Sequence, residues 1–251
     1  MKKEMVILVV SFDGYNDLWA PFFDSFFEAW PDCPYDVYLG STTKVFLHDR
    51  VKTICCDVDV DYSTNLKFYL NKINTKYVFF SIEDFFYRSN ISNRKISSII
   101  NEMDINGAKC LKNIFTYPFI RTEKSTQIAP LPLDTRYRVG MACSIWERKF
   151  LIDFLIEGES AWDIEKFGSE RSKNYPNAFY ALNYDYKNKF NLKYTHAVVG
   201  GRWFWEAVPF LIYKYPHILK NRKYMGPFMY LRVRLYRSVT WLLSYFKFVW
   251  T

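Results

Sequence analysis

Residues 77–84 read Tyr-Val-Phe-Phe-Ser-Ile-Glu-Asp, an apolar run that leads directly into two carboxylates. The run predicts a strand that is buried on both faces of a sheet. The carboxylates at its end, Glu83 and Asp84, repel each other and lose solvation, so they need a cation, hydrogen-bond donors or water nearby. A divalent cation that bridges to a substrate diphosphate would supply this compensation. The alternative interpretation is a solvated strand end followed by a turn.

The first half of the chain alternates strand and helix patterns around this strand. Strands are expected at residues 5–10, 37–39 and 51–56, and helices at residues 18–30, 63–73 (capped by Ser63) and 92–103. Later strands are expected at residues 108–114, 137–146 and 193–199. The alternation predicts an α/β fold, with a mixed, mostly parallel, Rossmann-like sheet covered by helices on both faces.

Ligands bind such sheets at the carboxyl ends of the strands. Three acidic loops are expected at those ends, and they are the predicted binding loops. They are Ser11–Asp17, Asp57–Asp61 and Glu83–Asp84.

Composition places the chain among ordinary globular proteins with a basic excess. Its 251 residues carry 34 Lys and Arg against 26 Asp and Glu, a net charge of +8, and 50% are apolar. These values exclude a disordered chain, and the 9 glycines exclude a collagen-like one. Five cysteines without a Cys-x-x-Cys pair predict ordinary thiols in a reducing compartment. No run approaches the roughly 18 apolar residues of a membrane span, so we expect a cytoplasmic protein.

Four segments carry a resemblance to a known family. They are Ser11–Trp19 (Ser-Phe-Asp-Gly-Tyr-Asn-Asp-Leu-Trp), Trp30–Tyr35, Tyr77–Phe86 and Gly158–Glu165 (Gly-Glu-Ser-Ala-Trp-Asp-Ile-Glu). In these segments the chain resembles bacterial glycosyltransferases of capsule and O-antigen loci, which are similar to the GT-A group of nucleotide-sugar transferases. The resemblance implies a GT-A-like catalytic domain over residues 1–207 that takes a sugar from a nucleotide-sugar donor.

The resemblance also implies where the nucleoside of the donor binds. It assigns this role to the loop after the first strand, through Ser11, Asp13 and Tyr15, and Asp17 belongs to the same acidic loop.

Glu83 and Asp84 would lie where GT-A enzymes place an Asp-x-Asp metal site. Because the two acids are adjacent here, they either bind Mg²⁺ or Mn²⁺ or contact the sugar hydroxyls directly. Lys67, Arg88 and Arg202 are candidates to offset the charge of the diphosphate. For each of these cations the alternative is a solvated surface position.

An inverting glycosyl transfer needs a carboxylate that removes the proton of the acceptor hydroxyl. Residues 158–165 offer Asp163, Glu165 and Glu159 for this role, and Trp162 could stack on an acceptor sugar. The same residues match a capping box in which Asp163 bonds back to the start of a helix. In that case Glu159 or Glu165 is the better candidate.

The C-terminal segment, residues 208–251, differs from the rest of the chain because it contains no acidic residue. Apolar residues recur in it at three- and four-residue steps, which predicts an amphipathic helix. The stripe consists of Phe228, Leu231, Leu235, Val239, Leu242, Phe246 and Val249. Basic and aromatic residues beside the stripe, Arg232, Arg234, Arg237 and Trp241, favour an anionic membrane surface over a nucleic acid. The alternative is docking against the catalytic domain or a partner chain.

Together these features predict a glycosyltransferase at the inner face of the cell membrane. It would transfer a sugar, with inversion, to a hydroxyl of a polyprenyl-diphosphate-linked glycan in capsule or O-antigen biosynthesis. Two other functions stay open, a sugar nucleotidyltransferase and a noncatalytic, membrane-peripheral assembly protein. The first would need a glycine-rich phosphate loop after the first strand, where the chain has only Gly14.

Overall fold

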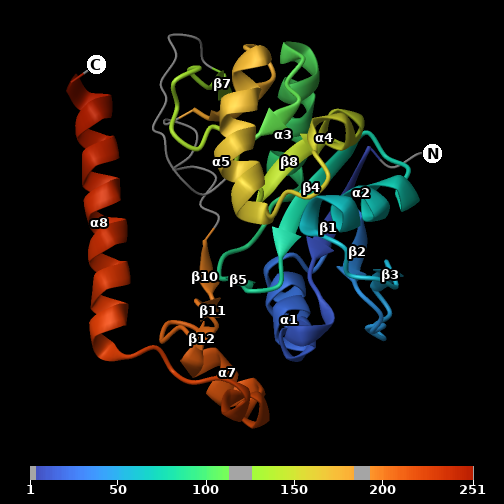
Figure 1. The fold of residues 1–251 in the computed structure, drawn as a ribbon, viewed down its shortest axis with the longest axis vertical. Helices are drawn as coiled ribbons and strands as arrows, with labels where there is room; N and C mark the ends of the chain where they lie inside the picture. Colours follow the sequence, from blue (N-terminus) through green and yellow to red (C-terminus); the bar gives the residue numbers. More distant parts are fainter. Residues whose placement is uncertain (1–3, 113–125, 184–192, 251) are drawn as a thin grey trace.

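The central element of the molecule is an eight-stranded sheet with helices on both faces (Figure 1). We describe it from a computed structural model that covers residues 4–112, 126–183 and 193–250, with the backbone alone for residues 240, 241 and 243–250. The strand order is β3-β2-β1-β4-β8-β6-β9-β7. The strands are β3 (Val51–Cys55), β2 (Asp36–Ser41), β1 (Met5–Val10), β4 (Tyr77–Ile82), β8 (Ser144–Glu147), β6 (Cys110–Leu111), β9 (Phe179–Leu182) and β7 (Ile128–Pro130).

The strands of one half of the sheet run in parallel, which brings their carboxyl ends to one edge. β1 pairs in parallel with β2 and β4, and β2 pairs in parallel with β3. In the other half, β8 is antiparallel to both β4 and β6, β6 is parallel to β9, and β7 is antiparallel to β9. This is the mixed, mostly parallel, Rossmann-like sheet that the sequence predicted, so the predicted α/β fold class is confirmed.

Alternate side chains of β1 enter two separate hydrophobic cores. Its odd-numbered residues pack with α1 (Trp19–Ala29) and α3 (Asn93–Asn106) on one face. Its even-numbered residues pack with α2 (Tyr62–Lys72), α4 (Arg148–Phe154) and α5 (Ala161–Arg171) on the other. Because both faces are buried, β1 and β4 are apolar at nearly every position. This pattern allowed both strands to be predicted from the sequence.

Two local predictions were wrong. α2 begins at Tyr62, and its cap is Asp61, whose carboxylate accepts a hydrogen bond of 2.9 Å from the Thr64 N–H. Ser63 instead donates from its hydroxyl to the Glu159 carbonyl, also at 2.9 Å. The strand expected at residues 137–146 begins only at Ser144, because Tyr137 and Cys143 have φ angles of 48° and 53°, which a strand does not accommodate.

Other boundaries differ by a few residues. The strand expected at residues 108–114 is present as β6, and its last two residues lie outside the described part of the chain. The strand expected at residues 193–199 is divided into β10 (Tyr194–His196) and β11 (Val198–Val199).

A second, smaller layer follows the carboxyl end of β4. β5 (Phe85–Tyr87) pairs with β10 in antiparallel fashion, and β11 pairs with β12 (Arg202–Trp203). The β11–β12 turn uses Gly200 and Gly201 at φ angles of 58° and 71°, a conformation that glycine adopts without strain. This layer lies beside the acidic pair, because the Ala197 N–H donates to the Asp84 carbonyl at 2.6 Å.

The chain then continues through α7 (Val208–Lys214) and the short helix η3 (Pro216–Asn221). Leu211 and Ile218 are buried in the same core as α1, and Trp203 forms a parallel bridge with Tyr224. The boundary predicted between residues 1–207 and 208–251 therefore lies within a packed region.

The C-terminal helix α8 (Pro227–Trp250) stands at one side of the molecule (Figure 1). Its inner side contacts the small layer, with the Tyr230 ring 5.3 Å from that of Phe204. Its outer side carries most of the predicted apolar stripe as exposed side chains, which are Phe228, Leu231, Leu235, Val239 and Leu242. The amphipathic helix predicted here is thus confirmed.

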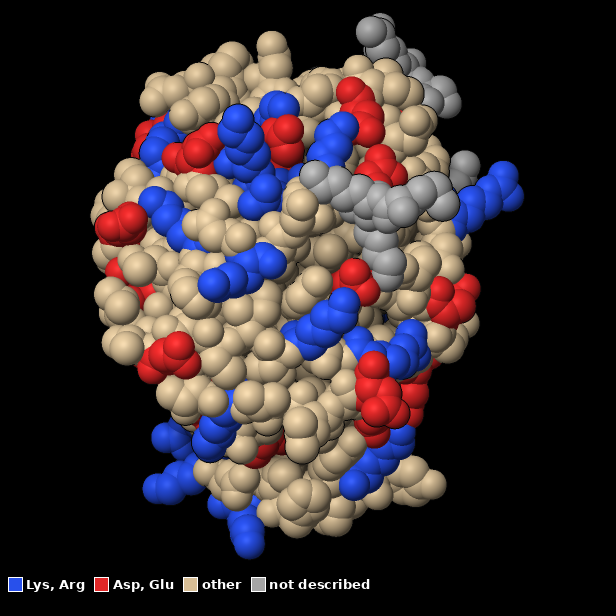
Figure 2. Space-filling view, turned by 90° about the vertical axis from the view of Figure 1, so that its right-hand side faces the viewer, with Lys and Arg blue, Asp and Glu red and all other residues tan. Residues whose placement is uncertain are grey.

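Charge is distributed differently on the side of the molecule that carries α2 and β3. Acidic and basic side chains are interspersed over much of that face (Figure 2). By contrast, α8 carries Arg232, Arg234, Arg237 and Lys247 and no acidic residue. Within the described part of the chain, no helix combines the length and the apolar character that crossing a bilayer requires.

Candidate functional site

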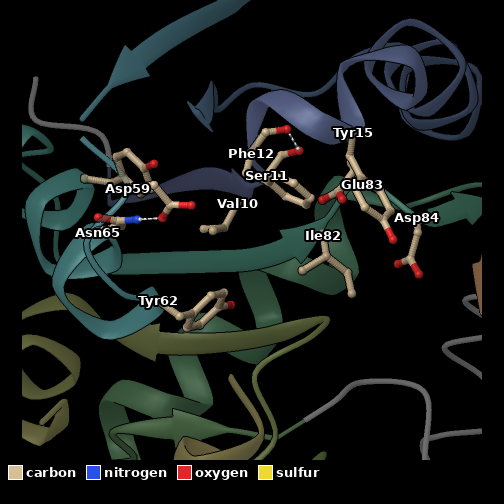
Figure 3. Close-up of a pocket in the computed structure, with 11 residues that line it drawn as sticks. Val10, Ser11, Phe12, Tyr15, Asp59, Tyr62, Asn65, Ile82, Glu83 and Asp84 are labelled. Carbon is tan, nitrogen blue, oxygen red and sulfur yellow. Dashed lines mark hydrogen bonds between the residues drawn. The ribbon is translucent and has the colours of Figure 1, made fainter. Parts of the chain in front are cut away.

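A pocket of about 520 Å³ opens at the carboxyl ends of β1 and β4 (Figure 3). This is the edge at which parallel sheets bind ligands, and the volume is within the usual range for small-molecule sites. The wall is formed by the loop after β1, the start of α2 and the end of β4. It consists of Val10, Ser11, Phe12, Tyr15, Asp59, Tyr62, Asn65, Tyr69, Ile82, Glu83 and Asp84.

The acidic pair forms one wall of this pocket. Glu83 is only 8% exposed, and Asp84 is partly buried. Burial raises the pKa of both carboxyls, and for Glu83 the neighbouring charge of Asp84 adds to the effect. Within the described residues, the Asp84 Oδ1 atom is buried and has no hydrogen-bond partner. Since a buried polar atom is normally bonded, this oxygen is available for a ligand.

The loop after β1 supplies a second wall. The Ser11 N–H donates to the Gly40 carbonyl at 2.9 Å, and the Ser11 hydroxyl accepts a bond of 2.8 Å from the Trp19 indole. The Phe12 and Tyr15 rings lie 4.9 Å apart, which places an aromatic surface at the pocket. Two of the residues predicted to hold the nucleoside, Ser11 and Tyr15, thus line the pocket together with the acidic pair.

Asp13 lies outside the pocket lining, although it belongs to the same loop. Its carboxylate accepts bonds from the N–H groups of Thr42, Thr43 and Lys44 and from the Thr43 hydroxyl at 2.6 Å. Asp13 therefore stabilises the loop that follows β2.

Asp17 also lies outside the lining, where it forms a bidentate ion pair with Arg222. The Arg222 guanidinium stands 4.7 Å from the centre of the Tyr15 ring and 5.0 Å from that of Trp203. Arg222 thus connects the C-terminal segment to the pocket wall. No local sequence pattern predicts this contact, because Asp17 and Arg222 are far apart along the chain.

The start of α2 completes the wall with residues that sequence reasoning missed. The Asn65 amide donates to the Asp59 carboxylate at 2.6 Å. Burial raises the pKa of Tyr62, and the charges of Glu83 and Glu165 raise it further. Tyr62 therefore lies within electrostatic reach of both the acidic pair and α5. Only the acidic loop Asp57–Asp61 marked this wall in the sequence.

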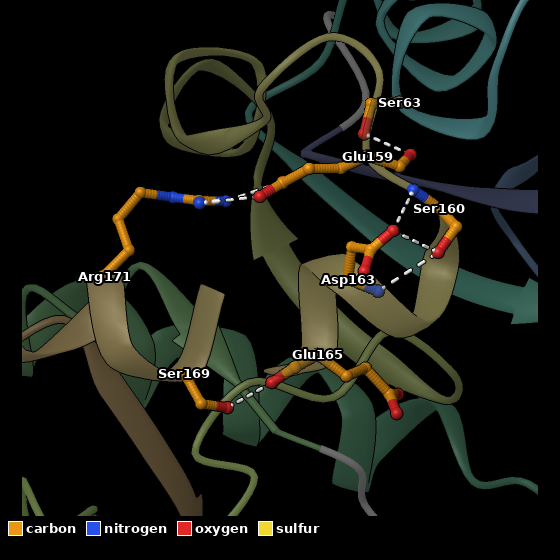
Figure 4. A network of polar contacts seen from close by, with 7 residues as sticks. All are labelled: Ser63, Glu159, Ser160, Asp163, Glu165, Ser169 and Arg171. Atoms are coloured by element: carbon orange, nitrogen blue, oxygen red, sulfur yellow. Dashed lines mark hydrogen bonds and ion pairs between the residues drawn. The ribbon is translucent and has the colours of Figure 1, made fainter. Parts of the chain in front are cut away.

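Of the three carboxylates considered as a catalytic base, two are engaged in local structure (Figure 4). Glu159 forms a bidentate ion pair with Arg171, with both distances at 2.9 Å. Asp163 forms the capping box of α5, in which its carboxylate accepts from the Ser160 N–H and hydroxyl and its own N–H donates to the Ser160 hydroxyl.

Glu165 has a different environment. It is partly buried, and the Met141 N–H donates to its Oε1 atom at 3.2 Å. Burial raises its pKa, while the Met141 bond and the charge of Lys112 lower it. The negative charge of Glu165 helps to raise the pKa of Tyr62, which lines the pocket. Glu165 does not line the pocket, but in the described part of the chain it is the one candidate of the three that neither an ion pair nor a helix cap holds.

The remaining predicted site residues do not line the pocket. The Lys67 ammonium lies 3.6 Å from a Glu157 oxygen, and Arg202 is exposed on β12. Trp162 is 80% exposed at the first turn of α5. Arg88 stands 5.4 Å from the Phe210 ring.

The residues predicted to meet a membrane divide between the two sides of α8. Arg232 is exposed, whereas Arg234 pairs with Glu206 at 2.5 Å and the Arg237 guanidinium lies 5.1 Å from the Phe204 ring. The Trp241 side chain lies outside the described residues.

The pocket fits a divalent cation only in part. The described residues hold no group of three or more His, Cys, Asp or Glu side chains that could bind a metal ion. However, Asp84 offers a buried oxygen that has no hydrogen-bond partner among the described residues, beside the second carboxylate, Glu83. Mg²⁺ is commonly held by one or two carboxylates together with substrate phosphates. The donor set therefore fits a cation that arrives with a diphosphate.

Comparison with known proteins places the chain near two kinds of solved structure. No family model matches the chain, and no curated protein does. S. aureus TarS 1–349 is similar at 14% identity and a TM-score of 0.47, over 73% of this chain and 60% of that one. The same protein in complex with UDP-GlcNAc gives 12% identity and a TM-score of 0.45 over 73% and 58%. A cytidylyltransferase from Leptospira borgpetersenii gives 13% identity and a TM-score of 0.48 over 89% and 99%.

The chain thus spans about 60% of the length of TarS 1–349.

Proposed function

We propose that the protein is a glycosyltransferase that moves a sugar from a nucleotide-sugar donor to a hydroxyl acceptor. The observation that supports this most is the buried acidic pair, Glu83 and Asp84, in a pocket of about 520 Å³ at the carboxyl ends of parallel strands. In this proposal the aromatic wall of Phe12 and Tyr15 holds the nucleoside, and the acidic pair faces the activated sugar and its diphosphate.

Glu165 is the proposed base, because Glu159 and Asp163 are engaged by Arg171 and Ser160. The acceptor oxygen forms a bond to the anomeric carbon while the bond from that carbon to the diphosphate oxygen breaks. The proton of the acceptor hydroxyl passes to the Glu165 carboxylate. A single displacement of this kind inverts the configuration of the sugar.

Asp84 and Glu83 are the residues that would hold Mg²⁺ or Mn²⁺. When bound, the cation would stabilise the negative charge of the departing diphosphate. The observation that supports this assignment is the buried Asp84 oxygen, which has no hydrogen-bond partner in the part of the chain that the structure describes.

The proposed acceptor is a polyprenyl-diphosphate-linked glycan of capsule or O-antigen biosynthesis at the inner face of the membrane. The outer side of α8 supports this part of the proposal. It exposes an apolar stripe on a helix that carries four basic and no acidic residues, as interfacial helices do. Arg232 and Trp241 are the proposed membrane contacts at this helix.

The test of the activity is a screen of nucleotide sugars, with and without Mn²⁺, in which binding and slow donor hydrolysis are followed. We expect one donor to bind and to release its nucleoside diphosphate. A nucleotidyltransferase would instead release pyrophosphate from a nucleoside triphosphate and a sugar phosphate. A noncatalytic assembly protein would show neither binding nor hydrolysis, and that result would contradict the proposal.

The test of the membrane contact is deletion of residues 226–251. The shortened protein is expected to lose binding to phosphatidylglycerol vesicles. It should still fold without nucleotide, because the buried core residues precede α8 in the chain. Unchanged vesicle binding would show that α8 serves another purpose.

A further inference from the structure

The inner side of α8 brings a cation toward the acidic pair. The Arg237 guanidinium lies over the Phe204 ring at 5.1 Å. The Phe204 N–H donates to the Ala197 carbonyl at 2.9 Å, and the Ala197 N–H donates to the Asp84 carbonyl at 2.6 Å. Arg237 is therefore connected to the backbone of the pocket residue Asp84 through two intervening residues, Phe204 and Ala197.

Electrostatics agree with this position. Burial raises the pKa of Asp84, and the positive charge of Arg237 lowers it. The pKa of His196 on β10 falls to about 3 through burial and the same charge. Arg237 thus acts on the groups at the Asp84 end of the pocket.

The other two arginines of this region that reach the body of the molecule have carboxylate partners. Arg222 is paired with Asp17, and Arg234 is paired with Glu206. Among the residues that the structure describes, no carboxylate pairs with Arg237, whose guanidinium is held by an aromatic ring instead. A guanidinium that lies over a ring can still present N–H donors to a ligand, and its planar fork of donors matches the oxygens of phosphates.

We propose that Arg237 binds the diphosphate of the nucleotide-sugar donor beside Asp84. This inference deepens the proposed function and rests on it. A diphosphate that binds beside a carboxylate pair is repelled by it. A metal ion or a protein cation is needed to offset the repulsion between these negative charges. Arg237 supplies such a cation from the helix that is proposed to lie on the membrane, so the donor site is complete only when α8 is docked.

The test compares Arg237→Gln with Arg232→Gln on the full chain. Arg232 lies on the same helix and is exposed, so it is the matched control. Calorimetry with nucleoside 5′-diphosphates and the corresponding monophosphates gives the readout. We expect Arg237→Gln to weaken diphosphate binding by about tenfold or more and to leave the affinity for monophosphates within about twofold. Arg232→Gln should leave both affinities unchanged and weaken binding to phosphatidylglycerol vesicles.

Arg237→Lys tests the role of the charge and guards against a folding defect. It is expected to retain more diphosphate affinity than Arg237→Gln, with the circular dichroism of both variants like that of the wild type. Equal diphosphate affinity in the wild type and Arg237→Gln would overturn the inference. If Arg237→Gln lowers the affinity for farnesyl diphosphate alone, the cation serves a lipid diphosphate, and the assignment to the donor is likewise overturned. A wild type that binds no nucleotide would refute the proposed function itself.

Discussion

Two acidic clusters lie near the pocket, and their carboxylates are used in opposite ways. At the start of α5, Glu159 and Asp163 are bonded to Arg171 and Ser160. At the end of β4, Asp84 keeps a buried oxygen without a partner among the described residues. A carboxylate that already has a good partner loses that partner if it takes up a proton or a ligand. Among these carboxylates, a buried oxygen without a described partner, rather than acidity, distinguishes the candidate site.

The largest effect is expected from Asp84→Asn. The change removes the charge but keeps the shape, so we expect sugar transfer to be abolished within detection. The protein should stay folded, because the substitution removes a repulsive charge from a buried pair. Transfer is measured with the donor found in the nucleotide-sugar screen, and the thermal midpoint serves as the control. Near-normal turnover would remove the acidic pair from the mechanism.

Glu165→Gln distinguishes the proposed base from its neighbours. Loss of a general base lowers kcat by about 10²–10⁴-fold, and the KM of the donor should change little. Asp163→Asn is the matched control on the same helix, and its kcat should stay within a few-fold of the wild type. If Asp163→Asn is the more damaging of the two, Asp163 is the base.

The burial of Glu83 predicts that the stability of the protein depends on pH. Burial raises the pKa of this carboxyl from 4.5 to about 8. A group with a raised pKa in the folded state binds its proton more tightly there than in the unfolded chain. Its stabilising contribution is therefore full below about pH 4.5 and is lost as the pH rises toward 8.

Glu83 contributes a slope of about 1.4 kcal/mol per pH unit in this window, and Asp84, whose pKa burial also raises, adds a slope of the same sign. Urea unfolding of the wild type at several pH values measures the total slope, and Glu83→Gln should make it shallower. If the free energy of unfolding of the wild type and of Glu83→Gln changed with pH in the same way, Glu83 would not be buried in its protonated form.

The smallest effect is expected at the capping box. Asp163→Ala removes the reciprocal bonds with Ser160 and should lower the free energy of unfolding by about 1 kcal/mol. Activity should change only slightly, because Asp163 is bonded to the start of its own helix. A normal stability together with a large loss of kcat would reverse the roles assigned to the two acidic clusters.

The fold could be predicted from the sequence because the two central strands are buried on both faces. Uninterrupted apolar runs placed β1 and β4 at their observed bounds, Met5–Val10 and Tyr77–Ile82. The acidic pair was found in the same way, since two carboxylates directly follow such a run. The capping alternative for Asp163 was also present in the spacing of Ser160 and Asp163.

The rest of the site depends on contacts between distant parts of the chain. Tyr62 is an ordinary aromatic residue in the sequence, and only the packing of α2 turns it toward the pocket. Arg222 and Arg237 belong to a basic segment that is typical of a membrane-bound helix. Their places beside Tyr15 and Phe204 depend on how residues 203–230 return to the sheet, and local patterns carry no information about that path.

The order of strands in the sheet also has a consequence for synthesis of the protein. β8 lies between β4 and β6 but follows both in the chain. On the ribosome, β4 therefore has an open hydrogen-bonding edge until Ser144–Glu147 has emerged. An unpaired apolar strand edge invites aggregation, so nascent chains that end before this point should depend on chaperones.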